Sequence, residues 1–344
     1  MRRFEGFQHG VNLGGWLSQC VALTEEHFDH FITEADIRRI AGMGLDHVRL
    51  PVDYDRIEDA AGDPIESGLA RIDACVEWCR AAGLNLLLDL HKAYGYTFDP
   101  LEVDADREIF FHDPALQARF IALWTRLARR YGRCENVAFD LLNEVISGAV
   151  ARNWNDIARR AVAAIRAFAP RTWVVIGGVH YNNVRSVPLL DPPADDRVVY
   201  GFHCYEPHVF THQKAYWMFD MPADLEVAYP DSVAHYLELS RGTSFDLAPA
   251  IEGVAVEGMG PAFFEAVFAP AIEAAERNGA PRYCGEYGVI DRAPVPDALR
   301  WLGDIRAAFE KHGIGRALWN YKQKDFGLVD PYLDGARDAL VKLL

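Results

Sequence analysis

The chain has 344 residues, half of them hydrophobic, which is enough to build one large core. Its 35 lysines and arginines are outnumbered by 50 aspartates and glutamates, so its formal net charge is −15. This acidic balance argues against a nucleic-acid or anionic-membrane partner, and we expect a monomer that acts on a small or neutral ligand.

Short apolar runs alternate with longer amphipathic stretches along the whole chain. The runs predict strands at 7–13, 46–52, 85–91, 136–142, 172–178, 198–205, 282–288 and 315–321. The clearest predicted helices lie at 33–44, 69–83, 114–132 and 154–170. Eight alternations with continuously apolar strands indicate an α/β fold with a closed parallel sheet covered by helices, a (β/α)8 TIM barrel.

The connection after the sixth predicted strand is too long for a single helix. It contains an aromatic-rich piece at 208–221, followed by acidic segments that carry prolines and glycines. We therefore expect residues 206–280 to form an insertion over the barrel mouth. The whole chain, 1–344, is expected to be one catalytic domain.

The cysteines and the N-terminal residues carry few signals. Cys75 and Cys79 are four residues apart within a helical pattern, which is not the CxxC spacing of a metal site. We expect reduced thiols and no metal or other cofactor. No apolar run of signal-peptide length follows Arg2 and Arg3, and no stretch is long enough for a membrane span. The expected location is cytoplasmic, or secreted if the sequence is a mature form.

Polar residues gather at the carboxyl ends of the predicted strands, where the active sites of such barrels lie. The strand ends carry Arg49, His91, Asn143, Glu144, His203, Tyr205, Glu286 and Trp319. Each residue taken alone has an ordinary structural explanation, such as a helix cap for Asn143 or packing for Trp319. Six strands that end on the same kind of chemistry indicate a site.

Two carboxylates delivered from opposite sides of a barrel suit glycoside hydrolysis. Glu144 and Glu286 follow the fourth and seventh predicted strands and can face each other across the mouth. In a retaining enzyme the two carboxyl groups are about 5–5.5 Å apart, one as acid/base and the other as nucleophile. We expect their surroundings to move their pKa values in opposite directions, with Arg49 keeping Glu286 ionised.

Seven segments resemble glycoside hydrolase family 5, and within it the compact single-domain endoglucanase C type. They are GVNLGGWLSQ, HVRLPVDYD, LDLH, DLLNE, FHCYEP, YCGEYGVI and ALWNYK, and together they span almost the whole chain. The resemblance implies that Glu144 is the acid/base and Glu286 the nucleophile. It also implies that Arg49 and Tyr205 lie close to the nucleophile. For His91, Asn143 and His203 it implies contacts with sugar hydroxyls, and for Trp319 a stacking platform.

Two positions depart from the pattern of similar endoglucanases. Lys92 follows His91 where a second histidine is usual, and Glu206 follows Tyr205 where an amide is expected. Both are possible further subsite residues. Aromatic residues in the loops and the insertion are also candidate sugar platforms, unless they pack against the barrel. They are Trp16, Tyr94, Tyr96, Phe210, Tyr216 and Trp217.

The expected function is that of a retaining endo-β-1,4-glucanase acting on cellulose-type and mixed-linkage β-glucan polysaccharides or oligosaccharides. The same residues would serve an exo-β-1,3-glucanase, a β-glucosidase or a mannanase, because the fold and the core chemistry do not set the substrate. An inactive carbohydrate-binding barrel is disfavoured because both glutamates are present. A metal-dependent hydrolase is disfavoured because His208 and His212, although four residues apart, lie in the expected insertion and outside any HExxH motif.

Overall fold

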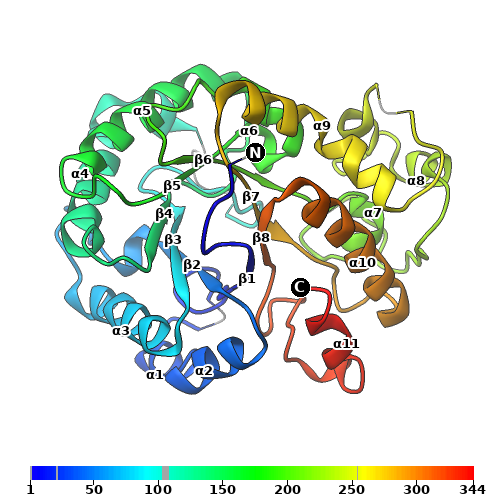
Figure 1. Cartoon of the computed structure of the whole chain (residues 1–344), viewed down its shortest axis with the longest axis horizontal. Helices are drawn as coiled ribbons and strands as arrows, with labels where there is room; N and C mark the ends of the chain where they lie inside the picture. The colour runs from blue at the N-terminus through cyan, green and yellow to red at the C-terminus, as the bar shows by residue number, and fades with distance from the viewer. Residues whose placement is uncertain (1, 21, 103–107, 254) are drawn as a thin grey trace.

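Eight parallel strands form the centre of the molecule (Figure 1). The computed structural model describes residues 2–20, 22–102, 108–253 and 255–344. The strands pair in chain order and close into a barrel in which β1 also pairs with β8. They are β1 (His9–Asn12), β2 (His47–Asp53), β3 (Asn85–Lys92), β4 (Val137–Asp140), β5 (Val174–Gly177), β6 (Val198–His203), β7 (Arg282–Tyr287) and β8 (Gly315–Leu318). The predicted (β/α)8 barrel is confirmed, with most strands shorter than expected.

Helices surround the barrel and cover its outer face (Figure 1). The α-helices are α1 (Glu25–His30), α2 (Glu34–Gly42), α3 (Glu66–Ala82), α4 (Pro114–Tyr131), α5 (Ala151–Arg166), α6 (Val179–Asn182), α7 (His208–Thr211), α8 (Val233–Ser240), α9 (Pro261–Asn278), α10 (Val295–His312) and α11 (Arg337–Val341). Short 3₁₀ helices are η1 (Tyr54–Arg56), η2 (Ile109–Phe111), η3 (Gly148–Val150), η4 (Val184–Leu189), η5 (Ala248–Ile251) and η6 (Pro331–Leu333). The four clearest predicted helices correspond to α2, α3, α4 and α5.

The sequence explains how these helices start and which face they bury. Asp113 precedes α4, and its carboxylate accepts a hydrogen bond from the amide of Ala115 at 2.7 Å, while Pro114 occupies the first helical position. In α5 the buried side chains recur every three or four residues, so one face packs against the sheet. These buried residues are Trp154, Ile157, Ala158, Ala161, Val162 and Ile165.

The barrel interior is layered. Its amino-terminal end is filled by a small apolar cluster that includes Leu87, Ala138 and Tyr283. Because side chains alternate across a strand, the residues two positions further along β3 and β4 also point into the barrel. Those residues are Asp89 and Asp140, and both are buried. A charged layer therefore lies above the apolar plug, directly beneath the barrel mouth.

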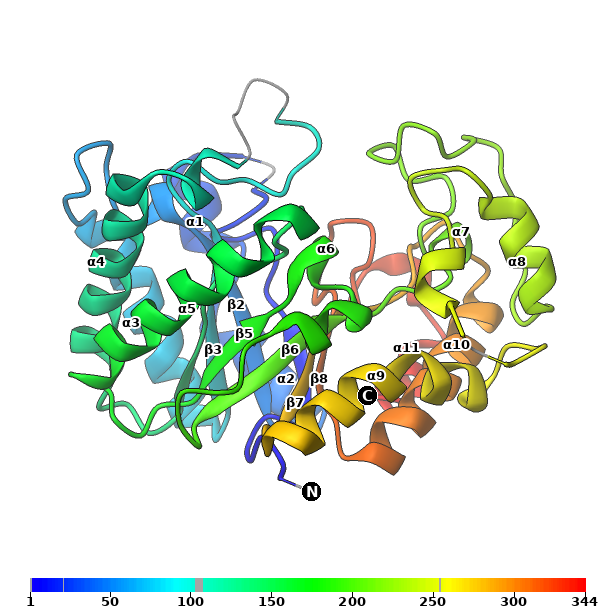
Figure 2. The same cartoon turned by 90° about the horizontal axis from the view of Figure 1, so that it is seen from above.

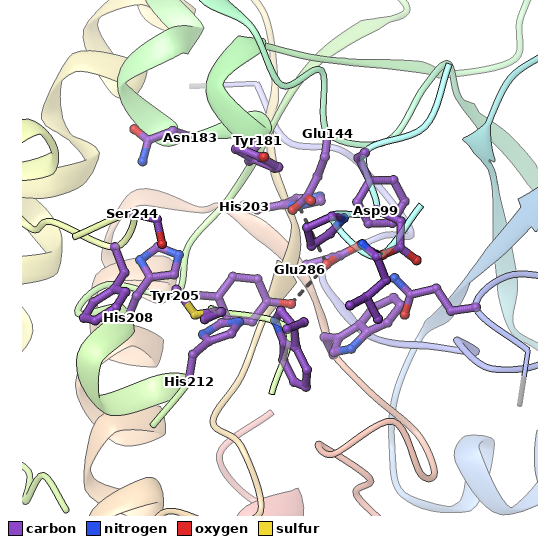
Figure 3. Close-up of a pocket in the computed structure, with 18 of the residues that line it drawn as sticks. Asp99, Glu144, Tyr181, Asn183, His203, Tyr205, His208, His212, Ser244 and Glu286 are labelled. Carbon is purple, nitrogen blue, oxygen red and sulfur yellow. Dashed lines mark hydrogen bonds and ion pairs between the residues drawn. The ribbon is translucent and has the colours of Figure 1, made fainter. Parts of the chain in front are cut away.

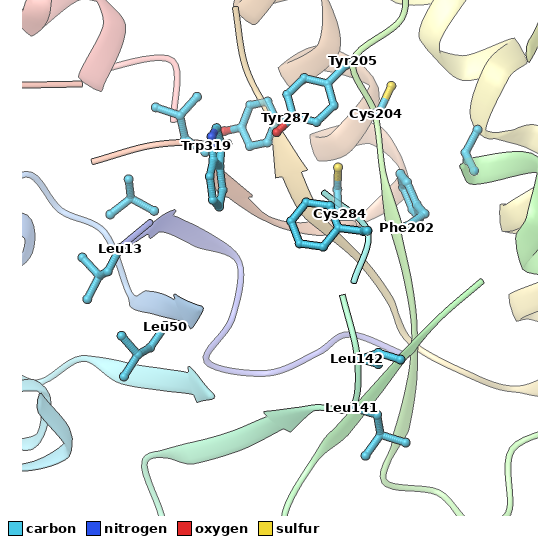
Figure 4. Close-up of a cluster of buried hydrophobic side chains, with 14 of the residues drawn as sticks. Leu13, Leu50, Leu141, Leu142, Phe202, Cys204, Tyr205, Cys284, Tyr287 and Trp319 are labelled. Carbon is cyan, nitrogen blue, oxygen red and sulfur yellow. The ribbon is translucent and has the colours of Figure 1, made fainter. Parts of the chain in front are cut away.

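A larger apolar cluster surrounds the strands and continues around the mouth (Figure 4). Leu50, Leu142, Phe202 and Cys284 belong to it and are essentially inaccessible to solvent. Trp319 closes this cluster at the end of β8 and has 6% of its surface exposed. The polar groups of the mouth are thus held in an apolar frame that keeps their side chains in fixed positions.

The β6–β7 connection is the longest in the chain. It carries α7, α8, η5 and α9, and its first part rises beyond the carboxyl ends of the strands, as do the described residues of the β3–α4 loop (Figure 2). Helix α9 lies with the ring of barrel helices, next to α10 (Figure 1). The range 206–280 expected as an insertion therefore includes one helix of the barrel ring.

Two further features bear on the environment of the protein. Among the described residues, no helix combines the length and the apolar composition that crossing a membrane requires. All six cysteines carry free thiols, and four of them are buried.

Candidate active site

A groove with a volume of about 1360 Å³ crosses the mouth of the barrel. Glu144 and Glu286 face each other in its middle (Figure 3). On one side of this pair the groove is lined by Asp99, and on the other by Asn183 and Ser244 (Figure 3). The pair is therefore flanked by groove surface in both directions.

Arg49 is the centre of the charged layer. It lies in the middle of β2, rather than near the strand end as predicted, and its long side chain reaches the mouth. Its guanidinium donates to Asp140 at 3.0 Å and to Glu286 at 2.8 Å. It also donates to Asn12 at 3.0 Å and to Asn143 at 2.9 Å.

Asp89 completes this arrangement, because its carboxylate lies 3.1 Å from Arg49. Although burial opposes the charge, Asp89, Asp140 and Glu286 raise the pKa of Arg49, so it stays ionised. Burial raises the pKa of Asp89 and of Asp140 to about 7, against the opposing effect of Arg49. The sequence analysis missed both acids. The available signal was an aspartate inside each of two apolar strands, NLLLDLH and NVAFDLL.

We expect Arg49→Met to lower the free energy of unfolding by about 3–5 kcal/mol, because the buried carboxylates of Asp89, Asp140 and Glu286 would lose their shared cationic partner. Arg282→Met is the matched control. Arg282 is also buried on a barrel strand, but its nearest carboxylate, 3.5 Å away, belongs to the half-exposed Glu276. Denaturant unfolding of both variants measures the difference. Equal losses would contradict the central role of Arg49.

Glu286 lies in β7, as predicted, and its carboxylate is held on both oxygens. Oε1 accepts from Arg49, and Oε2 accepts from the Tyr205 hydroxyl at 3.0 Å. Burial and the charge of Glu286 raise the pKa of Tyr205, so this phenol remains a donor. Tyr205 lies two residues beyond the end of β6. The two donors fix the direction of the Glu286 carboxylate.

Glu144 lies beyond the end of β4, which stops at Asp140. Its backbone has a φ of 39°, a left-handed conformation that is uncommon for a residue with a side chain. Its Oε1 is within hydrogen-bond distance, 2.8 Å, of His203 Nδ1. The Tyr96 hydroxyl donates to its carbonyl at 2.5 Å. Local strain is therefore held in place by contacts from β6 and from the β3–α4 loop.

The two carboxyl groups are close and electrostatically different. One carboxylate oxygen of Glu144, one carboxylate oxygen of Glu286 and one ring nitrogen of His203 all lie within 4.8 Å of one another. Burial, and then the charge of Glu286, raise the pKa of Glu144 well above its usual value. Burial also raises the pKa of Glu286, with Arg49 opposing the rise. We expected the two pKa values to move in opposite directions, and this was wrong for Glu286, because the effect of burial outweighs that of Arg49. The stronger rise in pKa is still that of Glu144.

Trp319 lines the groove, whereas His91 and Asn143 are buried and do not line it. The rings of His91 and Trp319 are parallel within 4°, with centroids 5.8 Å apart. His91 Nδ1 is 2.6 Å from Asp89, whereas His91 Nε2 is buried with no hydrogen-bond partner among the described residues. Asn143 Nδ2 is also buried with no hydrogen-bond partner among the described residues. Burial lowers the pKa of His91, so its ring is neutral. A buried polar atom without a partner is costly, so both atoms have hydrogen-bonding capacity that the described residues leave unused.

Gly14 packs against Trp319, a role that the sequence analysis missed. A Cβ atom at Gly14 would lie 2.5 Å from the Trp319 ring, so only glycine leaves space for the indole. The amide of Gly14 donates to the Asn320 side chain at 2.9 Å, and Asn320 donates back to the Gly14 carbonyl at 2.9 Å. The GVNLGG motif therefore supports the back of the tryptophan.

Lys92 and Glu206 both line the groove, and both are held by protein partners. Lys92 donates to Glu102, and the nearby acids raise its pKa despite its burial. Glu206 accepts from Asn183 at 2.9 Å and from the amide of Tyr205 at 3.1 Å. The two departures from the family pattern thus add charges at separate points of the groove wall.

The candidate aromatic platforms divide into two groups. Trp217 and the exposed Tyr216 line the groove, close to His212 and Phe326. Trp16 and Tyr94 lie outside it, which corrects the expectation for both. Trp16 is buried and donates to the carbonyl of Phe28 at 2.7 Å. Tyr94 packs under Arg119, whose guanidinium carbon lies 3.8 Å from the centroid of the Tyr94 ring.

Of the other two aromatic candidates, Phe210 is fully buried against Tyr229, and Tyr96 supports the Glu144 loop.

The two histidines weighed as a possible metal pair pack among aromatic side chains. His208 and His212 have ring centroids 5.2 Å apart within an aromatic group, and His212 Nδ1 is 3.0 Å from the Thr211 hydroxyl. Burial lowers the pKa of both histidines.

Comparisons with known proteins identify the family of this chain. The family model for cellulase (glycosyl hydrolase family 5) matches residues 8–325. Cellodextrinase A of Ruminococcus flavefaciens is 42% identical over 317 residues, which cover 92% of this chain and 86% of that protein. Endoglucanase C of Acetivibrio thermocellus is 39% identical over 343 residues, which cover 98% of both.

Solved structures show the same fold at lower sequence identity. Endoglucanase Cel5A from the hyperthermophilic Thermotoga maritima superposes with a TM-score of 0.75 at 22% identity, covering 98% of this chain and 96% of that one. The match of the family model over most of the chain, together with two relatives near 40% identity, identifies the family. The chain belongs to glycosyl hydrolase family 5.

Proposed function

We propose that the protein is a retaining endo-β-1,4-glucanase that cleaves internal bonds of cellulose-type and mixed-linkage β-glucans. The observation that carries this proposal is a close carboxyl pair in the middle of a groove that continues on both sides. Oxygens within 4.8 Å favour the retaining arrangement, because inverting enzymes separate the groups by roughly 6.5–9.5 Å. Endoglucanase C, the relative aligned over 98% of both chains, supports the substrate class.

In the first step Glu286 attacks the anomeric carbon while Glu144 gives its proton to the glycosidic oxygen. The bond to the leaving sugar breaks, and an ester between the glycosyl group and Glu286 forms. Arg49 and Tyr205 aim the attacking carboxylate. Burial and the charge of Glu286 raise the pKa of Glu144, which favours the protonated form that this step needs.

In the second step a water molecule takes the place of the departed sugar. Glu144, now ionised, removes a proton from this water as its oxygen attacks the anomeric carbon. The ester bond to Glu286 breaks, and two inversions leave the original configuration. The departure of Glu286 as a carboxylate is favoured by the hydrogen bond from Arg49 at 2.8 Å.

The remaining residues would bind the sugar before the scissile bond. His91 Nε2 and Asn143 Nδ2 are the buried polar atoms that a pyranose can satisfy through its hydroxyl groups. Trp319 offers its face to the ring, and His203 holds Glu144. Lys92, Glu206 and Trp217 are proposed as more distant subsite residues. No metal or organic cofactor enters either step.

We propose that the catalytic domain spans the chain and works as a monomer, with the first part of the β6–β7 connection forming one groove wall. A second candidate is preference for short cello-oligosaccharides, because a 42% identical relative is named cellodextrinase A. Groove surface on both sides of the carboxyl pair favours cleavage within a chain over removal of terminal sugars.

The test is product analysis on carboxymethylcellulose, mixed-linkage β-glucan, laminarin and mannan. We expect rapid viscosity loss and a ladder of oligosaccharides from the first two, and slow release from laminarin and mannan. Cleavage of soluble cello-oligosaccharides without viscosity loss would favour the second candidate. Glucose released mainly from laminarin would point to an exo-β-1,3-glucanase, and cleavage mainly of mannan to a mannanase.

A further inference from the structure

The groove is rich in exposed apolar side chains. Large apolar side chains with high exposure are uncommon on this protein, yet several of them line the groove. Those that do are Leu23, Leu101, Tyr181, Leu189, Tyr216 and Phe219. An exposed apolar surface inside a binding groove marks the surface that a ligand covers.

Tyr181 identifies which half receives the leaving group. Its amide donates to the carbonyl of Val145 at 3.0 Å, so it is tied to the residue after Glu144. Its side chain lies beside Glu144 in Figure 3. Since Glu144 protonates the leaving oxygen in the proposed mechanism, the half of the groove that begins at Tyr181 is the aglycone half.

Both walls of the aglycone half carry apolar side chains. One wall presents Tyr181, with 47% of its surface exposed, and Leu189, with 51% exposed. The wall from the β6–β7 connection presents Phe219, with 75% exposed, together with the largely buried Phe245 and Leu247. Together these five residues form what we call the apolar half-groove.

Hydrogen bonds hold the two walls in place. The Asp220 carboxylate accepts from the amide of Ser244 at 2.6 Å and from its hydroxyl at 2.7 Å, so Phe219 is kept near Phe245. Arg185 in η4 donates to the carbonyl of Glu252 at 2.8 Å, which joins the two walls to each other. The half-groove is therefore held together by hydrogen bonds between separate segments of the chain.

Two polar side chains of this half, Asn183 and Asp246, already have protein partners. Asn183 donates to Glu206 at 2.9 Å. Asp246 accepts from the amides of Gly242 and Ala248, at 3.0 and 2.9 Å. A ligand in this half therefore meets exposed apolar side chains beside polar groups that are already paired.

A strained turn sets Tyr181 in position. His180, Tyr181 and Asn182 have φ values of 54°, 58° and 54°, three consecutive left-handed residues without a glycine. A Cβ atom at Gly148 would lie 2.4 Å from the His180 ring, and one at Gly177 would lie 2.3 Å from the Asn182 side chain. Two glycines thus make space for a backbone conformation that costs free energy, as is common where a side chain must face a ligand.

We propose that the apolar half-groove binds aryl and alkyl alcohols, and that the protein therefore transfers glycosyl groups to such alcohols as a second activity. This inference rests on the proposed function. An alcohol bound there would take the place of water in the second step. Its oxygen forms a bond to the anomeric carbon, its proton passes to Glu144, and the ester bond to Glu286 breaks. No further reactant is needed.

The first experiment uses the unmodified protein with cellotetraose as donor. Benzyl alcohol is the apolar acceptor and glycerol the polar one, and mass spectrometry measures glycoside formed per bond cleaved. We expect benzyl transfer to saturate with concentration and to exceed glycerol transfer, because only the apolar alcohol occupies a site. Cleavage with no benzyl glycoside, or with equal and linear transfer to both alcohols, overturns this inference alone. No cleavage of cellotetraose overturns the proposed function as well.

The second experiment uses a double variant, Leu189→Ser with Phe219→Ser. Both side chains are largely exposed, so the fold should tolerate the changes. We expect the ratio of benzyl transfer to hydrolysis to fall about 5-fold or more, because apolar contact area is lost. Phe168→Ser is the matched control, since Phe168 is exposed but lies outside the groove, and its ratio should not change. An unchanged ratio in the double variant would contradict the assignment of the site.

Discussion

Glu286→Ala is expected to lower kcat on cellotetraose by at least roughly 10⁴-fold, because the covalent intermediate can no longer form. Added azide should restore turnover. The truncated side chain leaves space beside Arg49 on the face from which Glu286 attacks, and a small anion can enter it. Its single displacement gives an azide product of inverted configuration, which nuclear magnetic resonance identifies.

Glu58→Ala is the matched control for this experiment. Glu58 is also a buried carboxylate bound to an arginine, at 2.7 Å from Arg119, but it lies outside the groove. The folded control should keep its kcat and show no response to azide. More than a few per cent of normal activity in Glu286→Ala without azide, or a product of retained configuration with it, would remove Glu286 from its role.

Glu144→Gln is expected to lower kcat on cellotetraose by about 10²–10⁴-fold, the usual contribution of a general acid. Formation of the ester from a dinitrophenyl cellobioside should change far less, because that leaving group needs no proton. Comparing the two substrates in the same variant separates a lost proton donor from general damage to the site. A similar loss on both would contradict the acid assignment.

The pH profile gives a second readout on the same variant. Turnover requires Glu286 ionised and Glu144 protonated, so activity is lost below the pKa of Glu286 and above that of Glu144. Burial raises both pKa values, and Glu144 rises further because Glu286 is charged, so both limbs should lie above the range of a free carboxyl group. In Glu144→Gln the alkaline limb should disappear. Its persistence would assign that limb to another group.

The strands and the two glutamates were predictable because each has a local signal. Continuous apolar runs marked all eight strands, and Asn143 and Glu144 interrupted such a run with two polar groups. The exact strand ends were not predictable. The backbone of β4 stops at Asp140, yet Asn143 still donates to the carbonyl of Leu90 at 3.0 Å. Neighbouring strands, which the local sequence does not show, determine where the ladder ends.

The support around Arg49 could not be derived in the same way. Asp89 and Asp140 are far apart in the sequence, and only barrel closure brings both within about one hydrogen bond of the guanidinium. The pKa of Glu286 depends on the balance between burial and Arg49, and burial is a property of the whole fold. Trp16 and Trp217 look alike in sequence, but only the packing of α1 and the β6–β7 connection separates a core residue from a groove residue.

The bonds of Arg49 join the strands that make the barrel to the groups that make the site. Its partners come from β1, β3, β4 and β7, so one guanidinium is shared between closure of the sheet and orientation of Glu286. The orientation of Glu286 and the closure of the barrel therefore depend on the same side chain, and few substitutions at Arg49 leave both intact. Substrate range is free to diverge, because much of the groove wall belongs to the β3–α4 loop, the β5–β6 connection and the β6–β7 connection. New specificities within this lineage should arise by changes in those three segments while the charged centre stays the same.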